Sequence, residues 1–517
     1  MSEFQTNDDG YIAPSDHNIT AIKNKLNAIG SGFCLAKWNQ ITLHLGTGMI
    51  HSCHHPVPHK IPLDEIRATP LALLNTSVMK AARKEMLANR KPKECDYCWR
   101  IETNDGNSDR YLKSIEPWAL PTFDRTRQLT GDEDVFPSYL EVSFGNTCNM
   151  KCTYCGPEFS SMWVEDLKEH GPVKLNEGTP FTSWANGWQD LDSLNYRNRD
   201  TNPYLDTFWE IFPEVYPHLK VYRITGGEPL LNKELFKTLD WIKANPNPDL
   251  DLAINSNLAV PDKLWNRFVD AIVYLKDNKC LKKVSVFTSV EGWGSRAEYG
   301  RTGLDFGLFQ SRYEQLCALG NINAVIMATY NIFSVTSFQQ LLEWHLDLKA
   351  KYNPNNAVWS TEIKTGFNLL PGDSAVARRE RNPHHATVVS IDIPYLRHPA
   401  PLDVQYVDDD LVEQYMLPTL DYMSKNVTNN SWSRHQGFEE HELEKLKRII
   451  VNRLHFKNKG QTDRHDVEIQ NAAFYDFVND MDRRNKTDFC SVFPEMIPFY
   501  ERCKHAREKL RNDSASI

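Results

Sequence analysis

The chain has 517 residues, a formal net charge of −9, and hydrophobic and charged fractions of 41% and 25%. These values are typical of a globular protein with several domains, and they exclude a fibrous or a largely disordered chain. The acidic balance argues against a broad nucleic-acid-binding surface. The first residues lack the basic and apolar stretches of a signal peptide, and no run of about 18 apolar residues occurs. We therefore expect a cytoplasmic protein without a membrane partner.

The first region, residues 1–130, holds two pairs of cysteines joined by irregular polar segments. An amphipathic pattern over residues 70–91 predicts one helix there. Few other apolar residues are available for a core, so we expect this small region to need a bound metal for stability. The cysteines concerned are Cys34, Cys53, Cys95 and Cys98.

The second region, residues 131–400, alternates between short apolar runs and amphipathic stretches. In the stretch 232–245, Leu235, Leu239 and Ile242 share one helical face. Repeated strand–helix units predict a parallel sheet, either open or closed into a barrel. The expected strands lie at residues 138–144, 219–227, 249–257, 282–292 and 322–333.

The third region, residues 401–517, has helical patterns at 438–454 and 472–485. A long insertion, residues 181–212, precedes the second expected strand and carries Trp184, Trp188 and Trp209. Long loops at strand ends often line active sites, so we expect this insertion to form a lid or a substrate wall. The alternative is that its tryptophans form the aromatic core of an inserted helix.

Eleven cysteines in a reducing cytosol are more often metal ligands or isolated thiols than disulfides. Cys148, Cys152 and Cys155 have the spacing C-x3-C-x2-C directly after the strand 138–144. Three thiolates on one loop suit three irons of a four-iron cluster and leave the fourth iron open. A structural zinc usually takes four ligands from two separated pairs, so zinc and an unligated triplet remain the alternatives. We expect the other four cysteines to be buried and inert: Cys280, Cys317, Cys490 and Cys503.

This triplet resembles the signature of the radical S-adenosylmethionine (SAM) superfamily. The resemblance implies a [4Fe-4S] cluster on the three cysteines, with Tyr154 beside the nucleoside of SAM. The next expected strand ends in a second motif of the superfamily, GGEP, which holds the amino group of SAM. Two glycines permit close backbone approach, and a carboxylate offsets an ammonium. This second motif consists of Gly226, Gly227, Glu228 and Pro229.

Two later strand ends resemble the superfamily less closely. Asn257 aligns with an asparagine at the end of the third strand, but Leu258 replaces the usual glycine. Ser289 and Arg301 match positions that approach the ribose and carboxylate of SAM. The alternatives are a simple strand-end turn at Asn257 and a solvated surface charge at Arg301.

The first four cysteines resemble the auxiliary-cluster domains called SPASM and twitch. Cys34, Gly48 and Cys53 have the spacing of a hairpin that presents two thiols, and the pair Cys95 and Cys98 completes the set. In the superfamily this domain usually follows the barrel, whereas here it precedes it. The resemblance implies an auxiliary iron–sulfur cluster, while zinc and unligated thiols remain alternatives. We expect the neighbouring histidines to be solvated loop residues rather than ligands: His51, His54 and His55.

Together these resemblances imply an α/β fold with a partial (β/α)6-type TIM barrel at residues 131–400. A twitch-like domain at 1–130 precedes the barrel, and helices at 401–517 follow it. The implied activity is reductive cleavage of SAM to a 5′-deoxyadenosyl radical that abstracts a substrate hydrogen, with electrons from a flavodoxin or ferredoxin. A peptide is the first substrate expected, and a small metabolite or sugar the second. A non-catalytic iron–sulfur regulatory or binding protein is the alternative, and the sequence assigns no catalytic side chain.

Overall fold

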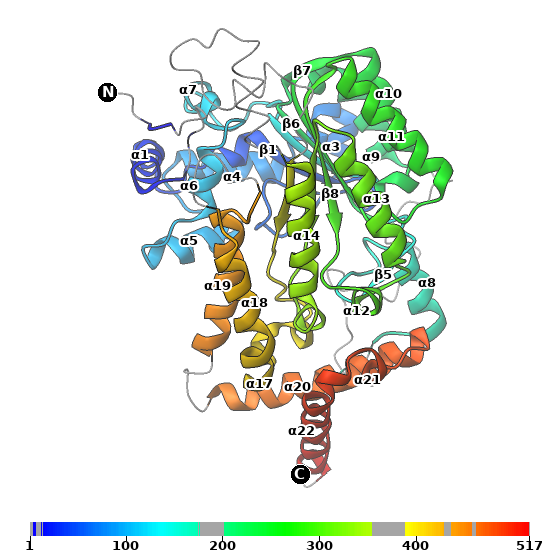
Figure 1. Ribbon diagram of the computed structural model, residues 1–517. Coiled ribbons are helices and arrows are strands. Elements are labelled where there is room, and N and C mark those ends of the chain that lie inside the picture. The colour runs from blue at the N-terminus through cyan, green and yellow to red at the C-terminus, as the bar shows by residue number, and fades with distance from the viewer. Residues whose placement is uncertain are drawn as a thin grey trace.

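The computed structural model has a mixed α/β fold built on one twisted sheet (Figure 1). It describes residues 4–6, 12, 14–173, 175, 201–353, 388–428, 436–456 and 462–515. Within these residues the sheet has nine strands in the order β11-β10-β8-β7-β6-β4-β1-β2-β3. All pairings from β11 to β1 are parallel, and the two beyond β1 are antiparallel. This arrangement is compatible with a partial TIM-like barrel.

The strand–helix alternation of the second region follows the hydrophobic pattern. Short apolar strands form the sheet, and helices with one apolar face pack on its outer side. The elements are β4 (Tyr139–Ser143), β5 (Lys151–Cys152), α8 (Ser161–His170), α9 (Pro203–Val215), β6 (Val221–Thr225), α10 (Lys233–Ala244), β7 (Asn247–Ser256), α11 (Asp262–Asp277), β8 (Leu281–Ser289), α12 (Ser295–Gly300), β9 (Arg301–Thr302), α13 (Phe306–Ala318), β10 (Asn323–Met327), α14 (Phe338–Tyr352) and β11 (Val388–Asp392).

The two faces of this sheet differ in exposure. In β4 and β6 the residues that point outward, such as Leu140 and Tyr222, are fully buried against helices. The residues that alternate with them, such as Glu141 and Arg223, are partly exposed. Because successive side chains of a strand point to opposite faces, this alternation defines an inner face that solvent reaches.

The first region contributes directly to the sheet. Strand β1 lies parallel to β4 and pairs with β2 as an antiparallel hairpin, which confirms the expected hairpin. Gly48 has φ +66° in the turn, and a Cβ there would lie 2.1 Å from the ring of Tyr204. The elements are α1 (Asp16–Asn27), α2 (Ala36–Asn39), β1 (Gln40–His44), β2 (Met49–His51), β3 (His59–Lys60), α3 (Leu63–Ala68), α4 (Ser77–Leu87), α5 (Asp96–Thr103), α6 (Asp109–Ser114) and α7 (Phe123–Thr126).

The helices of this region also enclose a second, smaller hydrophobic cluster. Its centre includes Phe33, Trp38 and Trp118, apart from the large cluster that surrounds the sheet. The sequence pattern therefore underestimated the apolar core available to residues 1–130.

Helices α20 (Thr462–Asn485) and α21 (Phe489–Val492) lie across the end of the molecule where the parallel strands finish, whereas α18 (Leu417–Lys425) and α19 (Glu440–Phe456) lie on the side of α14 (Figure 1). Arg484 of α20 forms a 2.6 Å ion pair with Asp166 of α8, and Tyr299 of α12 donates a 3.0 Å hydrogen bond to Asp482. Within the described part of the chain, none of the helices has the length and apolar character needed to span a bilayer. The third region also contains α17 (Asp409–Leu411) and α22 (Ile497–Ala515).

The expected strands of the second region are all present, although the ends differ by a few residues. The sequence pattern missed β3 and β11, the short strands at the two edges of this sheet, and the separate two-stranded pair of β5 and β9. Trp209 lies in α9, packs against Phe208 and donates a 2.8 Å hydrogen bond to Glu234, so it belongs to the core. Trp184 and Trp188 lie outside the described residues. The division into domains stays a prediction.

Candidate functional site

The three clustered cysteines lie on the loop after β4. Strand β5 within this loop pairs with β9, which sets Cys152 opposite Arg301. The Cys148 amide donates to the hydroxyl of Ser161 at 3.1 Å, and the indole of Trp163 donates to the Cys152 carbonyl at 2.9 Å. Burial raises the pKa of Cys148 to about 12. The thiols therefore release protons when they bind a metal, because thiolates are the ligands.

Arg301 joins this loop through a buried ion pair. Its guanidinium donates to both oxygens of Glu291 at 2.6 Å and to the sulfur of Cys152 at 3.3 Å. The Tyr154 hydroxyl donates to Glu291 at 2.6 Å and also contacts Arg301. Burial, the largest single influence, would lower the pKa of Arg301, but Glu291, Tyr154 and Cys152 together outweigh it and raise the pKa well above its usual value. A permanent positive charge therefore lies beside Cys152.

Arg301 is buried, and it is therefore not the solvated surface charge considered as an alternative. Its side chain is 6% exposed and that of Glu291 is 7% exposed. Sequence reasoning missed Glu291. The only signal for it is an acidic residue just beyond the end of β8, at the edge of the sheet where the other site residues gather.

The GGEP turn packs directly against the cysteine loop. The Glu228 amide donates to the Thr147 carbonyl at 2.7 Å. Gly226 and Gly227 have φ +78° and +47°, and a Cβ on Gly227 would lie 2.4 Å from the same carbonyl. Only glycine accommodates both the backbone conformation and the close approach. Pro229 follows as the first residue of a short 3-10 helix, η6 (Pro229–Leu231).

Glu228 is buried, and its carboxylate ties the ends of β6 and β7 together. It accepts hydrogen bonds from the Asn257 amide at 2.6 Å, the Ser256 hydroxyl at 2.9 Å and the Leu230 amide at 3.0 Å. Burial outweighs these donors and raises the pKa of Glu228 to about 7. In this structure the carboxylate therefore positions the strand ends.

Asn257 connects the end of β7 to the cysteine loop. Its side-chain amide donates to the Asn149 side chain at 2.9 Å. Leu258 adopts φ +61°, so the left-handed conformation that glycine usually takes is retained with a leucine. The Leu258 carbonyl accepts a 2.5 Å hydrogen bond from the buried Arg312, which holds the turn in place. Ser289 ends β8 opposite Met327 and is partly exposed.

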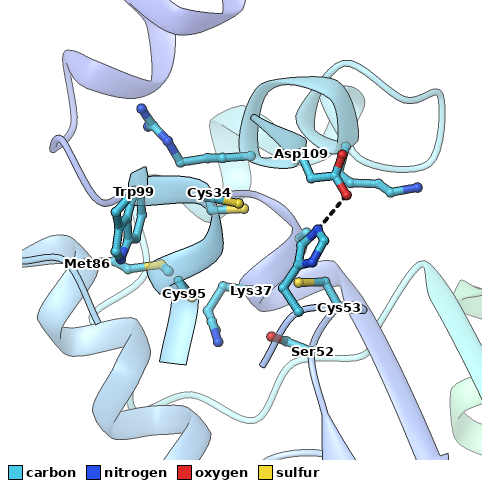
Figure 2. A pocket seen from close by; sticks show the side chains of 13 residues that line it. Cys34, Lys37, Ser52, Cys53, Met86, Cys95, Trp99 and Asp109 are labelled. Carbon is cyan, nitrogen blue, oxygen red and sulfur yellow. Dashed lines mark hydrogen bonds and ion pairs between the residues drawn. The ribbon is translucent and has the colours of Figure 1, made fainter. Parts of the chain in front are cut away.

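The four cysteines of the first region line a single pocket (Figure 2). Cys34 precedes α2, Cys53 follows β2, and Cys95 and Cys98 lie at the start of α5. These three segments are far apart in the sequence, and the hairpin and the helices bring them together. Burial raises the pKa of Cys95 to about 11 and the pKa of Cys53 and Cys98 to about 12.

Positive side chains accompany these thiols in the pocket. Lys37 is 3% exposed, lies between Cys95 and Cys53 in Figure 2, and forms an ion pair with Glu94. Arg110 is 2% exposed and forms a 2.8 Å ion pair with Glu102. These cations would offset the negative charge of a thiolate-ligated group.

The histidines beside Cys53 differ from the expected solvated loop. His51 is 9% exposed, and its Nε2 lies 3.0 Å from the Nε2 of His44. Burial and the neighbouring ring lower the pKa of His44 to about 4, so this pair is neutral at pH 7. His55 stacks on Tyr97 and lies 2.7 Å from an oxygen of Asp109. The expectation of solvation was wrong for His51, because β2 carries it into the sheet.

Neither group of thiols is arranged around a single ion. Among the described residues, no three His, Cys, Asp or Glu side chains are close enough to hold one metal ion. A tetrahedral zinc with Zn–S bonds of about 2.3 Å needs sulfurs about 3.8 Å apart. A four-iron cluster spreads its thiolates more widely, because each one binds a different iron. Thiolates are ligands of both zinc and iron–sulfur clusters, so the four thiols of the first region suit either group chemically.

Comparison with known proteins finds weak similarity over about a quarter of the chain. A GTP 3′,8-cyclase of Aliarcobacter butzleri is 29% identical over 135 residues, which cover 26% of this chain and 31% of that protein. GTP 3′,8-cyclases of Sulfurimonas denitrificans and Campylobacter lari are 30% and 29% identical, over 23% and 24% of this chain and 27% and 28% of their own lengths.

The chain thus spans about a third or less of the length of these curated relatives. No family model matches it, and no solved structure matches it. The similarity supports, at a general level, an enzyme of the radical SAM superfamily.

Proposed function

We propose that this chain is a radical SAM enzyme whose [4Fe-4S] cluster is held by Cys148, Cys152 and Cys155. SAM would lie beside the GGEP turn, Asn257 and Ser289. When bound, the cluster supplies the electron that cleaves SAM and so provides a radical for hydrogen abstraction from a substrate.

The observation that carries this proposal is the direct contact between the cysteine loop and the GGEP turn. The Glu228 amide holds the Thr147 carbonyl, one residue before Cys148. The two sequence motifs therefore meet at one point, although about 70 residues separate them. Similarity to the GTP 3′,8-cyclases over part of the chain supports the same assignment.

The residues around the triplet would bind and orient rather than transfer protons. Arg301 lies 3.3 Å from the sulfur of Cys152, where its charge favours the thiolate form of that ligand. Glu291 fixes the guanidinium through two hydrogen bonds. The C-terminal helices, held through the Asp166–Arg484 pair, would shield this end of the sheet from water.

We further propose an auxiliary iron–sulfur cluster in the pocket formed by Cys34, Cys53, Cys95 and Cys98. Support comes from the presence of all four thiols in one pocket together with the buried cation Lys37. Zinc remains the alternative ligand for this pocket. Unligated thiols are the third candidate, since Lys37 and Arg110 already have carboxylate partners in Glu94 and Glu102.

The substrate is either a peptide or a small molecule. The resemblance to SPASM and twitch proteins favours a peptide, whereas the relatives named GTP 3′,8-cyclase favour a small molecule such as a nucleotide. A flavodoxin or ferredoxin would serve as reductant. A non-catalytic iron–sulfur protein is the remaining candidate, and a SAM-cleavage assay separates it from an enzyme.

The test of the triplet measures iron and SAM cleavage in anaerobically reconstituted protein. We expect about eight irons per chain if both sites hold four-iron clusters. The dithionite-reduced protein should release 5′-deoxyadenosine, and Cys152→Ala should release none. Cys280→Ala is the matched control, because Cys280 is also buried but lies apart from both groups. Equal release by Cys152→Ala would refute the assignment.

The test of the auxiliary site uses Cys95→Ala. We expect the iron content to fall by about half while 5′-deoxyadenosine release persists, because the two groups of thiols lie on separate loops. A purely structural zinc predicts one zinc per chain instead. It also predicts rapid proteolysis across the first 130 residues when a ligand is removed.

A further inference from the structure

The inner face of the sheet carries an arginine that none of the motifs includes. Arg223 lies on β6, three residues before Gly226, and is partly exposed. Its neighbours in the sheet register are Glu141 of β4 and Ala253 of β7. Arg223 thus lies on the solvent-reached face, just below the proposed SAM site.

Three side chains contact the guanidinium of Arg223, namely Asn255, Phe287 and Tyr139. The Nε of Arg223 donates a 3.2 Å hydrogen bond to the side chain of Asn255, and the central carbon of the guanidinium lies 4.5 Å from the ring centroid of Phe287. Asn255 lies two residues after Ala253 on β7, and Phe287 is its register partner on β8. Both side chains are therefore nearer than Ala253 to the carboxyl ends of the strands. Asn255 and Phe287 thus lie toward the edge of the sheet where the two motifs meet, while Tyr139, the further hydrogen-bond partner, lies toward the opposite edge.

No carboxylate among the described residues forms an ion pair with Arg223. Several of the buried arginines have one; for example, Arg110 pairs with Glu102, Arg301 with Glu291 and Arg484 with Asp166. The fully buried Arg83 has none and donates instead to the Asn75 side chain and to backbone carbonyls. Asn255 accepts from the Nε of Arg223 only, so guanidinium N–H donors remain that could bind an anion on this solvent-reached face. The planar donors of a guanidinium match the geometry of carboxylate and phosphate groups.

The carboxylate-bearing residue Glu141 lies directly across from Arg223, on the neighbouring strand β4. Glu141 accepts a 3.3 Å hydrogen bond from Thr225, and its carboxylate remains free of an ion pair with Arg223. Glu141 and Arg223 thus lie on the inner face of β4 and β6, the two strands whose carboxyl ends carry the cysteine loop and the GGEP turn.

We propose that Arg223, oriented by Asn255 and Phe287, binds an oxyanion of the substrate, either a carboxylate or a phosphate. This inference rests on the proposed function and names the substrate class of the same site. Glu141 offers an acceptor for a hydroxyl or ammonium group of the same molecule. A neutral substrate without an oxyanion would leave the guanidinium uncompensated.

The test is calorimetric titration of the anaerobically reconstituted protein with pyrophosphate, GTP and malonate. Pyrophosphate and GTP represent a phosphate source, and malonate represents a carboxylate source. At least one should bind, and Arg223→Gln should weaken that binding tenfold or more. Arg223→Lys should weaken it less, because the charge is kept and only the planar fork is lost.

Arg267→Gln is the matched control. Arg267 also lies over a phenylalanine, at 4.1 Å from the Phe236 ring centroid, but it is on the outer helix α11 and pairs with Asp240. Its replacement should change anion binding less than twofold. Equal binding by wild type and Arg223→Gln, or no binding of any probe, would overturn the proposal.

Two readouts separate this proposal from the proposed function. Because SAM also carries a carboxylate, SAM is added as a competitor of the bound anion. Displacement of the anion by SAM would assign Arg223 to SAM binding and overturn its role in substrate binding. Arg223→Gln should keep its iron and its release of 5′-deoxyadenosine. If wild type binds the anion through Arg223 but releases no 5′-deoxyadenosine, the proposed function fails while the anion site stands.

Discussion

Replacing Glu291 by glutamine should destabilise the protein strongly, because it leaves a buried charge without its partner. Arg301 and Glu291 are joined by two hydrogen bonds of 2.6 Å, and their side chains are 6% and 7% exposed. Removal of one member of such a pair costs about 3–5 kcal/mol. We expect Glu291→Gln to lower the free energy of unfolding by about this amount.

The matched control is an exposed pair. Lys351 and Glu314 lie 2.5 Å apart, but their side chains are 60% and 43% exposed. Solvent screens exposed pairs, so Glu314→Gln should cost less than about 1 kcal/mol. The double variant Arg301→Met with Glu291→Met should recover most of the loss, because replacing both charges by apolar groups is often neutral.

The assay is urea unfolding of each purified variant, followed by circular dichroism and tryptophan fluorescence. The midpoint and the slope are compared, because a change in slope would indicate a different unfolded state. A loss below about 1 kcal/mol for Glu291→Gln would mean that water reaches the pair. Arg301 would then be a solvated charge, and its role beside Cys152 would be refuted.

Three further predictions concern the strand ends. Leu258→Gly should destabilise the folded protein by about 1–4 kcal/mol, because the loss of a buried leucine side chain exceeds the ~1 kcal/mol gained by relieving its left-handed backbone. A variant that is more stable than wild type in urea would refute this. Gly226→Ala should lower stability and SAM affinity, because its Cβ would lie 1.7 Å from the Ser143 hydroxyl. The control Gly171→Ala, at a glycine with φ +74° and open space around it, should affect stability less and SAM affinity not at all. Between about pH 4.5 and 7 the free energy of unfolding of the wild type should fall by about 3 kcal/mol relative to that of Glu228→Gln. The reason is that the folded state keeps the Glu228 proton up to a pKa of about 7, while the unfolded chain releases it near 4.5. Parallel stability profiles of the two proteins in urea would contradict this.

Several features of the site could be predicted from the sequence because they depend on local spacing. Cys148, Cys152 and Cys155 are confined to one loop by eight residues of chain, whatever surrounds them. The two glycines before Glu228 indicate a turn with close backbone approach, and both have positive φ. Strand–helix alternation likewise predicts the parallel sheet, because each element carries its own hydrophobic period.

Other features depend on which strands become neighbours, and only the tertiary structure decided them. The pairing of β1 with β4 carries His51 into the sheet and brings Cys53 into the pocket of Cys95. Leu258 keeps a glycine-like conformation because Arg312, far away in the sequence, binds its carbonyl. No local pattern identifies Arg223, which lacks an ion pair among the described residues, since this is known only once the carboxylates around it are placed. Burial and counter-charges arise from long-range packing, and the sequence alone does not specify them.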